Sequence, residues 1–429
     1  MSHPQYSSLK KLFEDMQKKI ISNCVQCGEC IDVCPVVPIS SLSELESAEV
    51  AEKMFEVLKD GIYSDTAYIK AFSCTGCAEC IEACPQGLNP MIFHQAVKNR
   101  LVASGKSIPE GLGMFLPDKE PFLPNILNSI QMKPSDARWL SKAPPDPEKK
   151  EVVFFMGCGT LATPNKNFAL IDILERIGVD FAALIGGKLC CGVPSILAGQ
   201  LKEADFLSRN LIKNIEAYSP KKLVVTCPTC YNQFKNVIAQ IKSFDFEVQF
   251  ISTFLNDNID KLKFTTPLNK KLTLHEPCPL ARELRDDLSI RKIIKALPGV
   301  ELIEMKHNRE ESLCCGGAAG LTYPEYAGKF SLNLMEEGEN AKVDGMINIC
   351  PFCHLSLCPI GHQYSFELTD LATLINEAQG GRTYEDRLTK YWSYKDLDKI
   401  LEESKEYIKE SNFSLEMMKQ ILPMLFHLS

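Results

Sequence analysis

Two hydrophobic periodicities divide this chain. In the first third, apolar residues recur at intervals of three and four, which predicts amphipathic helices. Residues 9–21 form the clearest case, with one apolar face made of Leu9, Leu12, Phe13, Met16 and Ile20. We expect this helix to pack on its own domain rather than on a membrane surface. A second helix is predicted over 46–60, and Asn89-Pro90 predicts the N-cap and first residue of a third.

Beyond residue 150 the pattern changes to short apolar runs that alternate with helical segments. The runs predict strands, and the segments 168–177 and 201–217 predict helices between them. The order then repeats, so that the predicted strands fall into two sets: 152–155, 180–185 and 223–226, followed by 271–275, 300–305 and 346–349. Strands alternating with helices indicate parallel sheets, one in each half of this region.

Two segments fall outside these patterns. Residues 104–150 contain eight prolines, which exclude a long helix or a central strand. We expect an ordered crossover there, anchored by Trp139 and Leu140. Residues 376–429 return to helical spacing after Gly380-Gly381, and this extension either docks a partner or covers its own domain. The expected domains are 1–105, 106–150 (the linker), 151–265, 266–375 and 376–429.

Composition narrows the class of protein. The length of 429 residues suits two or three domains, and an apolar fraction of 45% supplies ordinary cores. The net charge is −8 and no cluster of Lys and Arg is present, which argues against nucleic-acid binding. We see no secretory signal and no apolar stretch that approaches 18 residues, so no membrane span of its own is expected. The expected location is cytoplasmic, with peripheral attachment to the membrane through a partner left open.

Cysteine spacing carries the chemistry. Eighteen of the nineteen cysteines fall into four frames, and only Cys358 is left over. Disulfide scaffolds are short, whereas this chain is long and rich in predicted helix, so a reducing compartment and metal binding are favoured. Near the N-terminus a CxxCxxCxxxCP run occurs twice, as Cys24, Cys27, Cys30 and Cys34 and then as Cys74, Cys77, Cys80 and Cys84.

This spacing is that of a two-cluster ferredoxin, in which the fourth cysteine of each run binds the other cluster. One [4Fe-4S] cluster is then predicted on Cys24, Cys27, Cys30 and Cys84, and the other on Cys74, Cys77, Cys80 and Cys34. Gly28 and Gly76 suit the tight loops. Structural zinc also uses CxxC pairs, but a four-cysteine run followed by Pro, present twice, disfavours it. We expect His94 to be packed or exposed rather than a ligand.

A second pair of frames has five cysteines each. Each frame contains, in order, a single cysteine, a Cys-Cys-Gly and a Cys-Pro-x-Cys. The first frame consists of Cys158, Cys190, Cys191, Cys227 and Cys230. The second frame consists of Cys278, Cys314, Cys315, Cys350 and Cys353. Each group follows a predicted strand, where open α/β sheets bind their ligands. Pro228 and Pro351 suit the first turn of a helix. Because five thiols exceed the four that a cube needs, the sequence leaves open a cluster of unusual shape or a cube with a free thiol.

The paired frames resemble the catalytic subunit of heterodisulfide reductase, with its two cysteine-rich CCG domains. Residues 151–375 carry the resemblance, most clearly in His275-Glu276-Pro277-Cys278, Cys314-Cys315-Gly316-Gly317 and Cys350-Pro351-Phe352-Cys353. Residues 20–105 resemble the small subunit of the same enzyme and the iron–sulfur subunits of glycolate oxidase and anaerobic glycerol-3-phosphate dehydrogenase. The resemblance implies an α+β multi-domain protein. A helical ferredoxin-like domain would precede two pseudo-repeated α/β CCG domains with parallel sheets.

It also implies a function. Each complete half would hold a noncubane [4Fe-4S] cluster on its five cysteines, and two cubane clusters would feed the pair. The two noncubane clusters would face each other across a cavity and reduce a small-molecule disulfide such as CoM-S-S-CoB to two thiols, or run the reverse, in anaerobic metabolism such as methanogenesis. The alternative is an electron-transfer subunit of a flavin-linked glycolate, lactate or glycerol-3-phosphate dehydrogenase, in relatives of which one half has often lost cysteines.

One position departs from the resemblance. Many relatives have His after the cysteine that opens the second half, where this chain has Pro279. A histidine there could donate a proton or bind substrate. His275 and His354 could substitute, although histidines at strand ends and in helices are more often simply hydrogen-bonded.

The electron donor is expected to be another subunit. The chain has no GxGxxG and no Walker A motif, and the glycines at 316–320 belong to the CCG frame. Candidate donors are a flavin-bearing reductase subunit, a hydrogenase or formate dehydrogenase module, or a b-type cytochrome.

Overall fold

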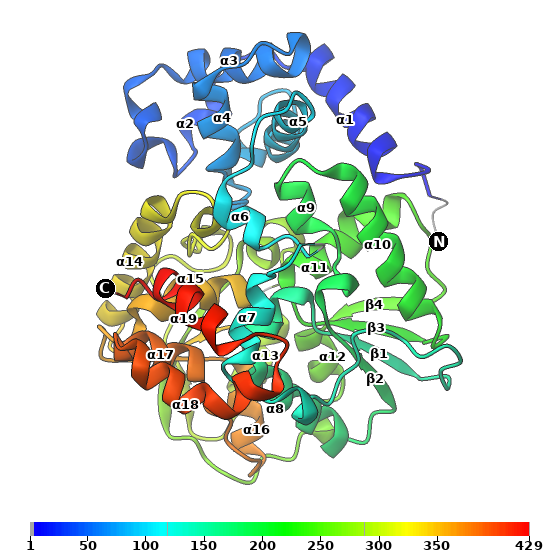
Figure 1. The fold of residues 1–429 in the computed structure, drawn as a ribbon, viewed down its shortest axis with the longest axis vertical. Coiled ribbons are helices and arrows are strands. Elements are labelled where there is room, and N and C mark those ends of the chain that lie inside the picture. Colours follow the sequence, from blue (N-terminus) through cyan, green and yellow to red (C-terminus); the bar gives the residue numbers. More distant parts are fainter. Residues whose placement is uncertain (1–3, 118, 287, 429) are drawn as a thin grey trace.

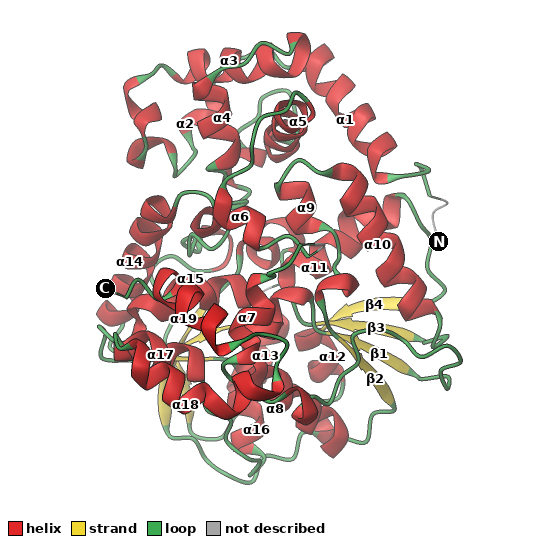
Figure 2. Cartoon of the chain, in the orientation of Figure 1, coloured by secondary structure: helices red, strands yellow, loops and turns green. Residues whose placement is uncertain are grey.

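The computed structural model describes residues 4–117, 119–286 and 288–428 (Figure 1). The N-terminal helices, blue in Figure 1, sit above a larger body that contains two sheets, and the C-terminal helices, red, cross one side of that body. Helices dominate and the strands are short (Figure 2). The α+β architecture with parallel sheets predicted from the sequence is confirmed.

The N-terminal unit is helical, as the spacing of its apolar residues predicts. Leu9, Leu12, Phe13 and Ile20 are buried on one face of α1, and Asn89 caps α5 by accepting a hydrogen bond from the Met91 amide at 3.0 Å. Both features confirm the sequence-based expectation. The helices are α1 (Leu9–Asn23), α2 (Glu29–Asp32), α3 (Ser47–Asp60), α4 (Asp65–Phe72) and α5 (Pro90–Ala103).

The first half of the larger body is a four-stranded parallel sheet of order β2-β1-β3-β4. The three predicted strands are present, and the edge strand β4 was not predicted. Its elements are β1 (Val152–Phe155), α8 (Pro164–Arg176), β2 (Phe181–Leu184), α9 (Val193–Leu197), α10 (Leu201–Glu216), β3 (Lys222–Val225), α11 (Pro228–Asn232), β4 (Glu247–Phe250) and α12 (Ile251–Asp257).

The second half repeats this topology as β6-β5-β7-β8, again all parallel. The edge strand β8 was likewise not predicted. Its elements are β5 (Lys270–His275), α13 (Leu288–Ala296), β6 (Val300–Leu302), α14 (Pro324–Asn340), β7 (Gly345–Asn348), α15 (Pro351–Gly361), β8 (Glu367–Thr369) and α16 (Leu371–Ala378). The matching strand order supports duplication of one unit.

The proline-rich crossover is ordered and has only two short α-helices among its described residues, α6 (Glu110–Met114) and α7 (Leu123–Ser129). Its predicted anchors are confirmed. Trp139 packs on Phe168 with ring centroids 5.3 Å apart. Leu140 joins the edge of the first sheet, donating to Ala183 O at 2.9 Å and accepting from the Ile185 amide at 3.0 Å. The crossover is therefore bound to the first half.

The C-terminal extension forms α17 (Arg387–Tyr394), α18 (Leu397–Glu410) and α19 (Leu415–Leu425). These helices pack on the chain itself. The Tyr391 side chain is fully buried, and its hydroxyl donates to Ile130 O at 3.1 Å. Of the two interpretations left open by the sequence, the packing supports a cover over the chain's own domain. Met424 of α19 is 67% exposed.

The N-terminal unit is held against both halves. Asn99 Nδ2 donates to Gly199 O of the first half at 2.8 Å. From the second half, Arg282 Nη1 donates to Cys77 O at 3.2 Å and pairs with Glu79 at 3.3 Å. These contacts hold Cys77 against the second half.

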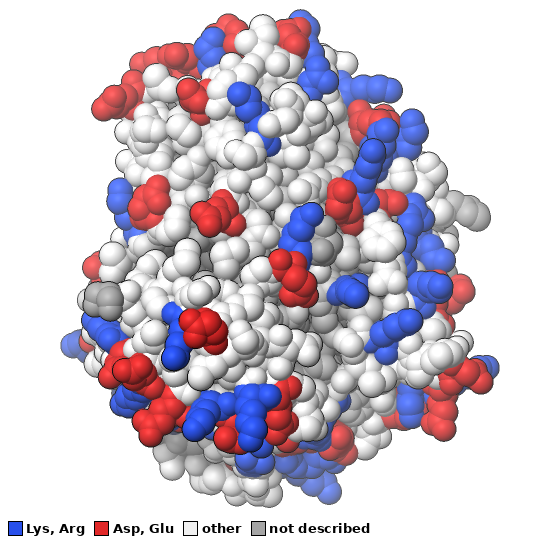
Figure 3. Space-filling model, in the orientation of Figure 1, with Lys and Arg blue, Asp and Glu red and all other residues white. Residues whose placement is uncertain are grey.

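The surface shows no strongly basic face in the view drawn. Acidic and basic side chains are interspersed around the margin in Figure 3, and the centre of that face is largely uncharged. Within the described ranges, none of the helices has the length and apolar character needed to cross a bilayer.

Candidate functional site

The five cysteines of the first half converge at the carboxyl ends of β1, β2 and β3. Cys158 Sγ lies 3.4 Å from Cys190 Sγ, and Cys191 Sγ lies 3.2 Å from Cys230 Sγ. Cys227 interacts in turn with Cys230, so the five thiols form one continuous group. Burial raises the pKa of Cys190, and a metal would have to displace the proton to bind there.

The second half brings its five cysteines together in the same order. Cys278 interacts with Cys314, Cys315 Sγ lies 3.0 Å from Cys353 Sγ, and Cys353 interacts with Cys350. Hydrogen bonds from Cys278 and then Cys315 lower the pKa of Cys314 despite its burial. The two halves thus present matching thiol groups, each built on the ends of equivalent strands.

Backbone geometry supports thiolates at both groups. The Gly192 amide donates to Cys190 Sγ at 3.4 Å, and the Gly316 amide donates to Cys314 Sγ at 3.3 Å. Cys350 is the N-cap of α15, so the free amides and partial positive charge of that helix terminus lie beside it. The expectation that Pro228 and Pro351 open the helices after Cys-Pro-x-Cys is confirmed.

The N-terminal cysteines form two further groups, each of which mixes the two runs. Cys84 acts electrostatically on Cys24 and Cys30, together with Cys27. Burial raises the pKa of Cys30 to about 12. Cys80 is acted on by Cys74 and then, from the first run, by Cys34 and more weakly by Cys30. The fourth cysteine of each run therefore reaches across to the other run.

The sequence analysis did not single out Lys70, which lies beside the group that contains Cys34. Its side chain is fully buried, and Nζ lies 3.2 Å from Cys34 Sγ and 3.4 Å from His94 Nε2. Burial opposes the lysine's charge, but the thiolates of Cys34 and Cys74 outweigh it and raise its pKa. His94 is packed, as expected, and burial lowers its pKa. No local signal in the sequence marks Lys70, because its burial beside the thiols is a feature of the tertiary structure.

One N-terminal group borders the second half directly. Cys77 packs with Cys278 and Cys314 in a small apolar cluster that also contains Val36 and Phe330. Cys77 and Cys314 interact electrostatically, as do Cys77 and Cys278. Cys27, by contrast, is exposed. The N-terminal groups therefore extend from the surface to the thiols of the second half.

A cavity of about 300 Å³ reaches the second thiol group, and all five of its cysteines line the wall. From the first half the cavity is lined by Val193, Ile196 and Thr229, which are close in sequence to that half's cysteines. None of the five cysteines of the first half is among the described residues that line the cavity. Pro279 and Glu283 also line it, although the sequence analysis did not select Glu283. A small molecule could therefore approach the second group from between the halves.

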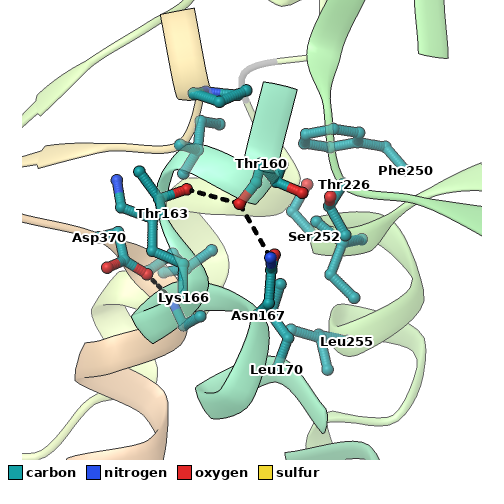
Figure 4. Close-up of a pocket in the computed structure, with 15 residues that line it drawn as sticks. Thr160, Thr163, Lys166, Asn167, Leu170, Thr226, Phe250, Ser252, Leu255 and Asp370 are labelled. Carbon is teal, nitrogen blue, oxygen red and sulfur yellow. Dashed lines mark hydrogen bonds between the residues drawn. The ribbon is translucent and has the colours of Figure 1, made fainter. Parts of the chain in front are cut away.

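A second, smaller pocket lies where the ends of β3 and β4 meet those of β7 and β8 (Figure 4). Its volume is about 50 Å³, and Thr160, Thr226 and Asp370 are among the residues that line it. Asn167 Nδ2 donates to Thr160 O at 2.9 Å across one side. No described cysteine lines this pocket.

The two candidate histidines have different surroundings. His275, at the end of β5, is fully buried with Nε2 3.3 Å from Cys353 Sγ, and burial lowers its pKa to about 4. His354 points away from the thiols and pairs with Asp386 at 3.0 Å. The leftover Cys358 is buried among apolar side chains of α7 and the C-terminal helices. His275 is thus the histidine that adjoins a cysteine group.

The donor sets fit iron–sulfur clusters. His275, Cys315 and Cys353 offer ligand atoms within 4.8 Å of one another, but each half adds further thiols in the same continuous group. Groups made of soft thiolates select iron–sulfur clusters or zinc, and a tetrahedral zinc site needs four ligands rather than five. Amide donors at sulfur are typical surroundings of such clusters.

Comparison with known proteins agrees with this chemistry. Residues 20–88 match a 4Fe-4S dicluster domain, and residues 152–235 and 272–358 each match the cysteine-rich domain abbreviated CCG. The chain is therefore an iron–sulfur protein that joins a dicluster domain to two cysteine-rich domains.

Several relatives are named as subunits of reductases. The chain is 28% identical to a subunit of the dihydromethanophenazine:CoB–CoM heterodisulfide reductase of Methanosarcina barkeri, over 68% of this chain and 74% of that one. The Methanosarcina mazei counterpart is also 28% identical, over 69% and 75%. A fumarate reductase (CoM/CoB) subunit of Methanothermobacter marburgensis is 28% identical over 63% of this chain and 50% of that one. The chain is a homologue of this heterodisulfide reductase subunit, which confirms the resemblance.

Proposed function

We propose that this chain is the iron–sulfur subunit of a disulfide reductase, an oxidoreductase that converts a small-molecule disulfide into two thiols. The observation that carries the proposal is the complete five-thiol group in both halves, with the second group open to a cavity of about 300 Å³. Loss of cysteines from one half would have favoured a relay subunit. The names of the relatives, the two heterodisulfide reductase subunits above all, support the same reaction class.

The proposed ligands follow the thiol groups. Two cubane [4Fe-4S] clusters would use Cys24, Cys27, Cys30 and Cys84, and Cys34, Cys74, Cys77 and Cys80. Two noncubane [4Fe-4S] clusters would use the five cysteines of each half. The electrostatic partners of Cys24, Cys30 and Cys80 support the exchange of the fourth cysteines between runs. When bound, the clusters would supply electrons one at a time to a reaction that needs two.

The route of electrons follows from exposure and contact. Exposed Cys27 suits the side that faces a donor, and buried Cys77 lies against Cys278 and Cys314 of the second half. The chain itself would orient the clusters and keep the thiols of the second group buried. The donor is proposed to be a partner protein, with a flavin-bearing subunit, a b-type cytochrome, or a hydrogenase or formate dehydrogenase module as the candidates. Two relatives that are named as subunits of reductases support a multi-subunit enzyme.

A pair of cysteine variants on α15 tests the proposal. The anaerobic holoprotein should reduce a small disulfide with reduced methyl viologen as donor, forming two thiols per disulfide consumed. Cys353→Ala removes a member of the second thiol group and should abolish the reaction. Cys358→Ala should leave the rate within about twofold, because a buried cysteine outside the group acts as a small apolar side chain.

Two outcomes would contradict the proposal. Equal rates for Cys353→Ala and the parent protein would show that the second group has no part in the reaction. Absence of any disulfide reduction by a fully loaded holoprotein would favour the alternative, an electron-transfer subunit of a flavin-linked hydroxy-acid dehydrogenase.

A further inference from the structure

The cavity beside the second thiol group has an unusual charge balance for a site that handles metabolites. Among the described residues that line it, none is Lys, Arg or His, and the one carboxylate is Glu283. Burial raises the pKa of Glu283, whose side chain hydrogen-bonds Asn232. No cationic side chain in the described lining could therefore neutralise an anionic group on a substrate.

One wall of the cavity is made of carboxamides. Asn232, Gln233, Asn236 and Gln240 come from the segment that begins with α11 and continues through a π-helical turn at Gln233–Val237. Asn236 Nδ2 donates to Asn232 Oδ1 at 2.6 Å. Turns of this type insert an extra residue into a helix and are frequent at functional sites. Among these four carboxamides Asn236 is the exposed one, so it lies at the mouth of the cavity.

Gln233 has a free hydrogen-bond donor in this wall. Its side chain is 3% exposed, and its Nε2 has no hydrogen-bond partner among the described residues. A buried amide nitrogen without a partner is uncommon in folded proteins, because the lost hydrogen bond is not replaced by water. A carbonyl or hydroxyl oxygen of a bound molecule would satisfy it.

The lining also has an apolar part, made of Leu12, Phe13 and Met16 of α1 together with Ile92 and Ile196. A molecule that fills the cavity therefore meets both methylene-binding side chains and amides. An anionic arm would lose its hydration without gaining a cation, and Glu283 would repel it when ionised.

We propose that the cavity selects a disulfide whose arms are uncharged and carry amide or hydroxyl groups, and that it excludes anionic disulfides, so that the sulfonate-bearing CoM-S-S-CoB suggested by the resemblance is not the substrate of this chain. This inference rests on the proposed disulfide reductase function. The reaction is RS–SR plus two electrons and two protons giving two RSH, with the electrons from a reduced low-potential donor and the protons from solvent. Gln233 acts as a donor to the polar arm, and the α1 side chains receive the methylenes.

A pair of small disulfides that differ in charge tests the proposal on the holoprotein with reduced methyl viologen. Bis(2-hydroxyethyl) disulfide is neutral, and the disulfide of 2-mercaptoethanesulfonate carries two sulfonates. We expect kcat/KM for the neutral compound to exceed that for the sulfonate at least about tenfold, because a charged arm would be buried without a counter-ion. An equal or larger value for the sulfonate would overturn the proposal.

A substitution that adds a cationic side chain to the cavity lining gives a second test. Asn236→Lys, at the mouth of the cavity, should shift the ratio of the two kcat/KM values at least severalfold toward the sulfonate. Lys235→Gln is the matched control, because Lys235 is exposed on the same turn and does not line the cavity, and its ratio should stay that of the parent. An Asn236→Lys ratio unchanged from the parent would contradict the inference.

Binding without turnover separates this inference from the proposed function. The melting temperature of the oxidised holoprotein should rise with the neutral disulfide and not with the sulfonate at the same concentration. If neither disulfide is reduced but the neutral one still stabilises the protein, disulfide reductase function fails while the charge preference stands. Equal stabilisation by both, or none by either, would overturn the charge preference itself.

Discussion

Gly28 and Gly76 both lie within the N-terminal cysteine loops with left-handed backbone, at φ +86° and +70°. Their surroundings differ. A Cβ at Gly28 would lie 2.5 Å from the Ala48 amide nitrogen, in the first turn of α3, whereas a Cβ at Gly76 would have no atom within 4 Å. The left-handed conformation costs an alanine about 1–2 kcal/mol at either site, and only Gly28 adds a backbone clash.

This contrast gives the first prediction. Gly28→Ala should lower the free energy of unfolding of the holoprotein clearly more than Gly76→Ala, whose cost should stay near about 1–2 kcal/mol. Anaerobic thermal unfolding with iron analysis of each variant is the measurement. Equal destabilisation by the two substitutions would contradict the close approach of the loop to α3.

Lys70 supports a second prediction at the residue scale. Its buried charge lies 3.2 Å from Cys34 Sγ and should stabilise the more negative, reduced state of a cluster bound there. Lys70→Met should lower the midpoint potential of one N-terminal cluster by an amount on the order of 50–100 mV, for an effective dielectric constant of about 20. A redox titration followed by EPR measures it.

The control for the Lys70→Met substitution is Lys53→Met. Lys53 lies on α3 and pairs with Glu56 at the surface at 3.1 Å. This variant should leave both N-terminal potentials at the parent values. Unchanged potentials in Lys70→Met would mean that the lysine does not act on the cluster.

Sequence reasoning was least informative for residues whose role depends on distant contacts. The cysteines could be found because metal ligands have fixed spacing. The sequence could not reveal Lys70, Gln233 and Glu283 in the same way. Lysine, glutamine and glutamate are common residue types, and only the tertiary structure brings these three near the thiols. A buried charge or amide gives no local pattern of its own.

At the scale of elements, α17 begins with a charged cap. Asp386 accepts hydrogen bonds from the Thr389 amide at 3.1 Å and from its hydroxyl at 2.8 Å, and pairs with His354 at 3.0 Å. Burial opposes the charge of Asp386, but His354 outweighs burial and lowers the carboxyl pKa. A lowered pKa means that the stabilisation is present at neutral pH and is lost as the pH falls below the unfolded value of about 4.

A prediction follows from the lowered pKa of Asp386. Asp386→Asn keeps the hydrogen-bonding cap but removes the charge, and should lower stability at pH 7 by about 1–3 kcal/mol. The difference from the parent protein should shrink as the pH falls below about 4. Thermal unfolding from pH 7 to pH 3 measures it. Asp396→Asn, at the cap of α18, is the control and should show a smaller difference at pH 7.

Helices and strands were predicted well where their hydrophobic pattern in the sequence is long or strongly apolar. The central strands β1 and β3 were found because their residues are mostly apolar. The central strands β5 and β7 were found because the order of strands and cysteines repeats before Cys278 and Cys350. The strands β4 and β8, each at one edge of its sheet, were missed because they begin with the exposed Glu247 and Glu367 and have no continuous apolar run. Edge strands face solvent on one side and do not need an apolar run.

At the scale of the whole molecule, the repeated strand order explains why both halves present their thiols in one way. Equivalent strands end at equivalent cysteines, so the duplication seen in the sequence became a duplicated site. The sequence could not show that Cys77 lies against the second half, because the N-terminal unit docks through contacts such as Arg282 to Cys77 O. This docking links the N-terminal groups to the second half.

The measurement that tests the central claim most directly is anaerobic iron and sulfide analysis combined with EPR of the oxidised chain, with and without a thiol. We predict about sixteen irons per chain, as four [4Fe-4S] clusters require, and a paramagnetic signal that appears only when thiol is added. Cys353→Ala should lose that signal, and Cys358→Ala should keep it. About eight to twelve irons with no response to thiol would contradict the account and indicate a relay subunit instead.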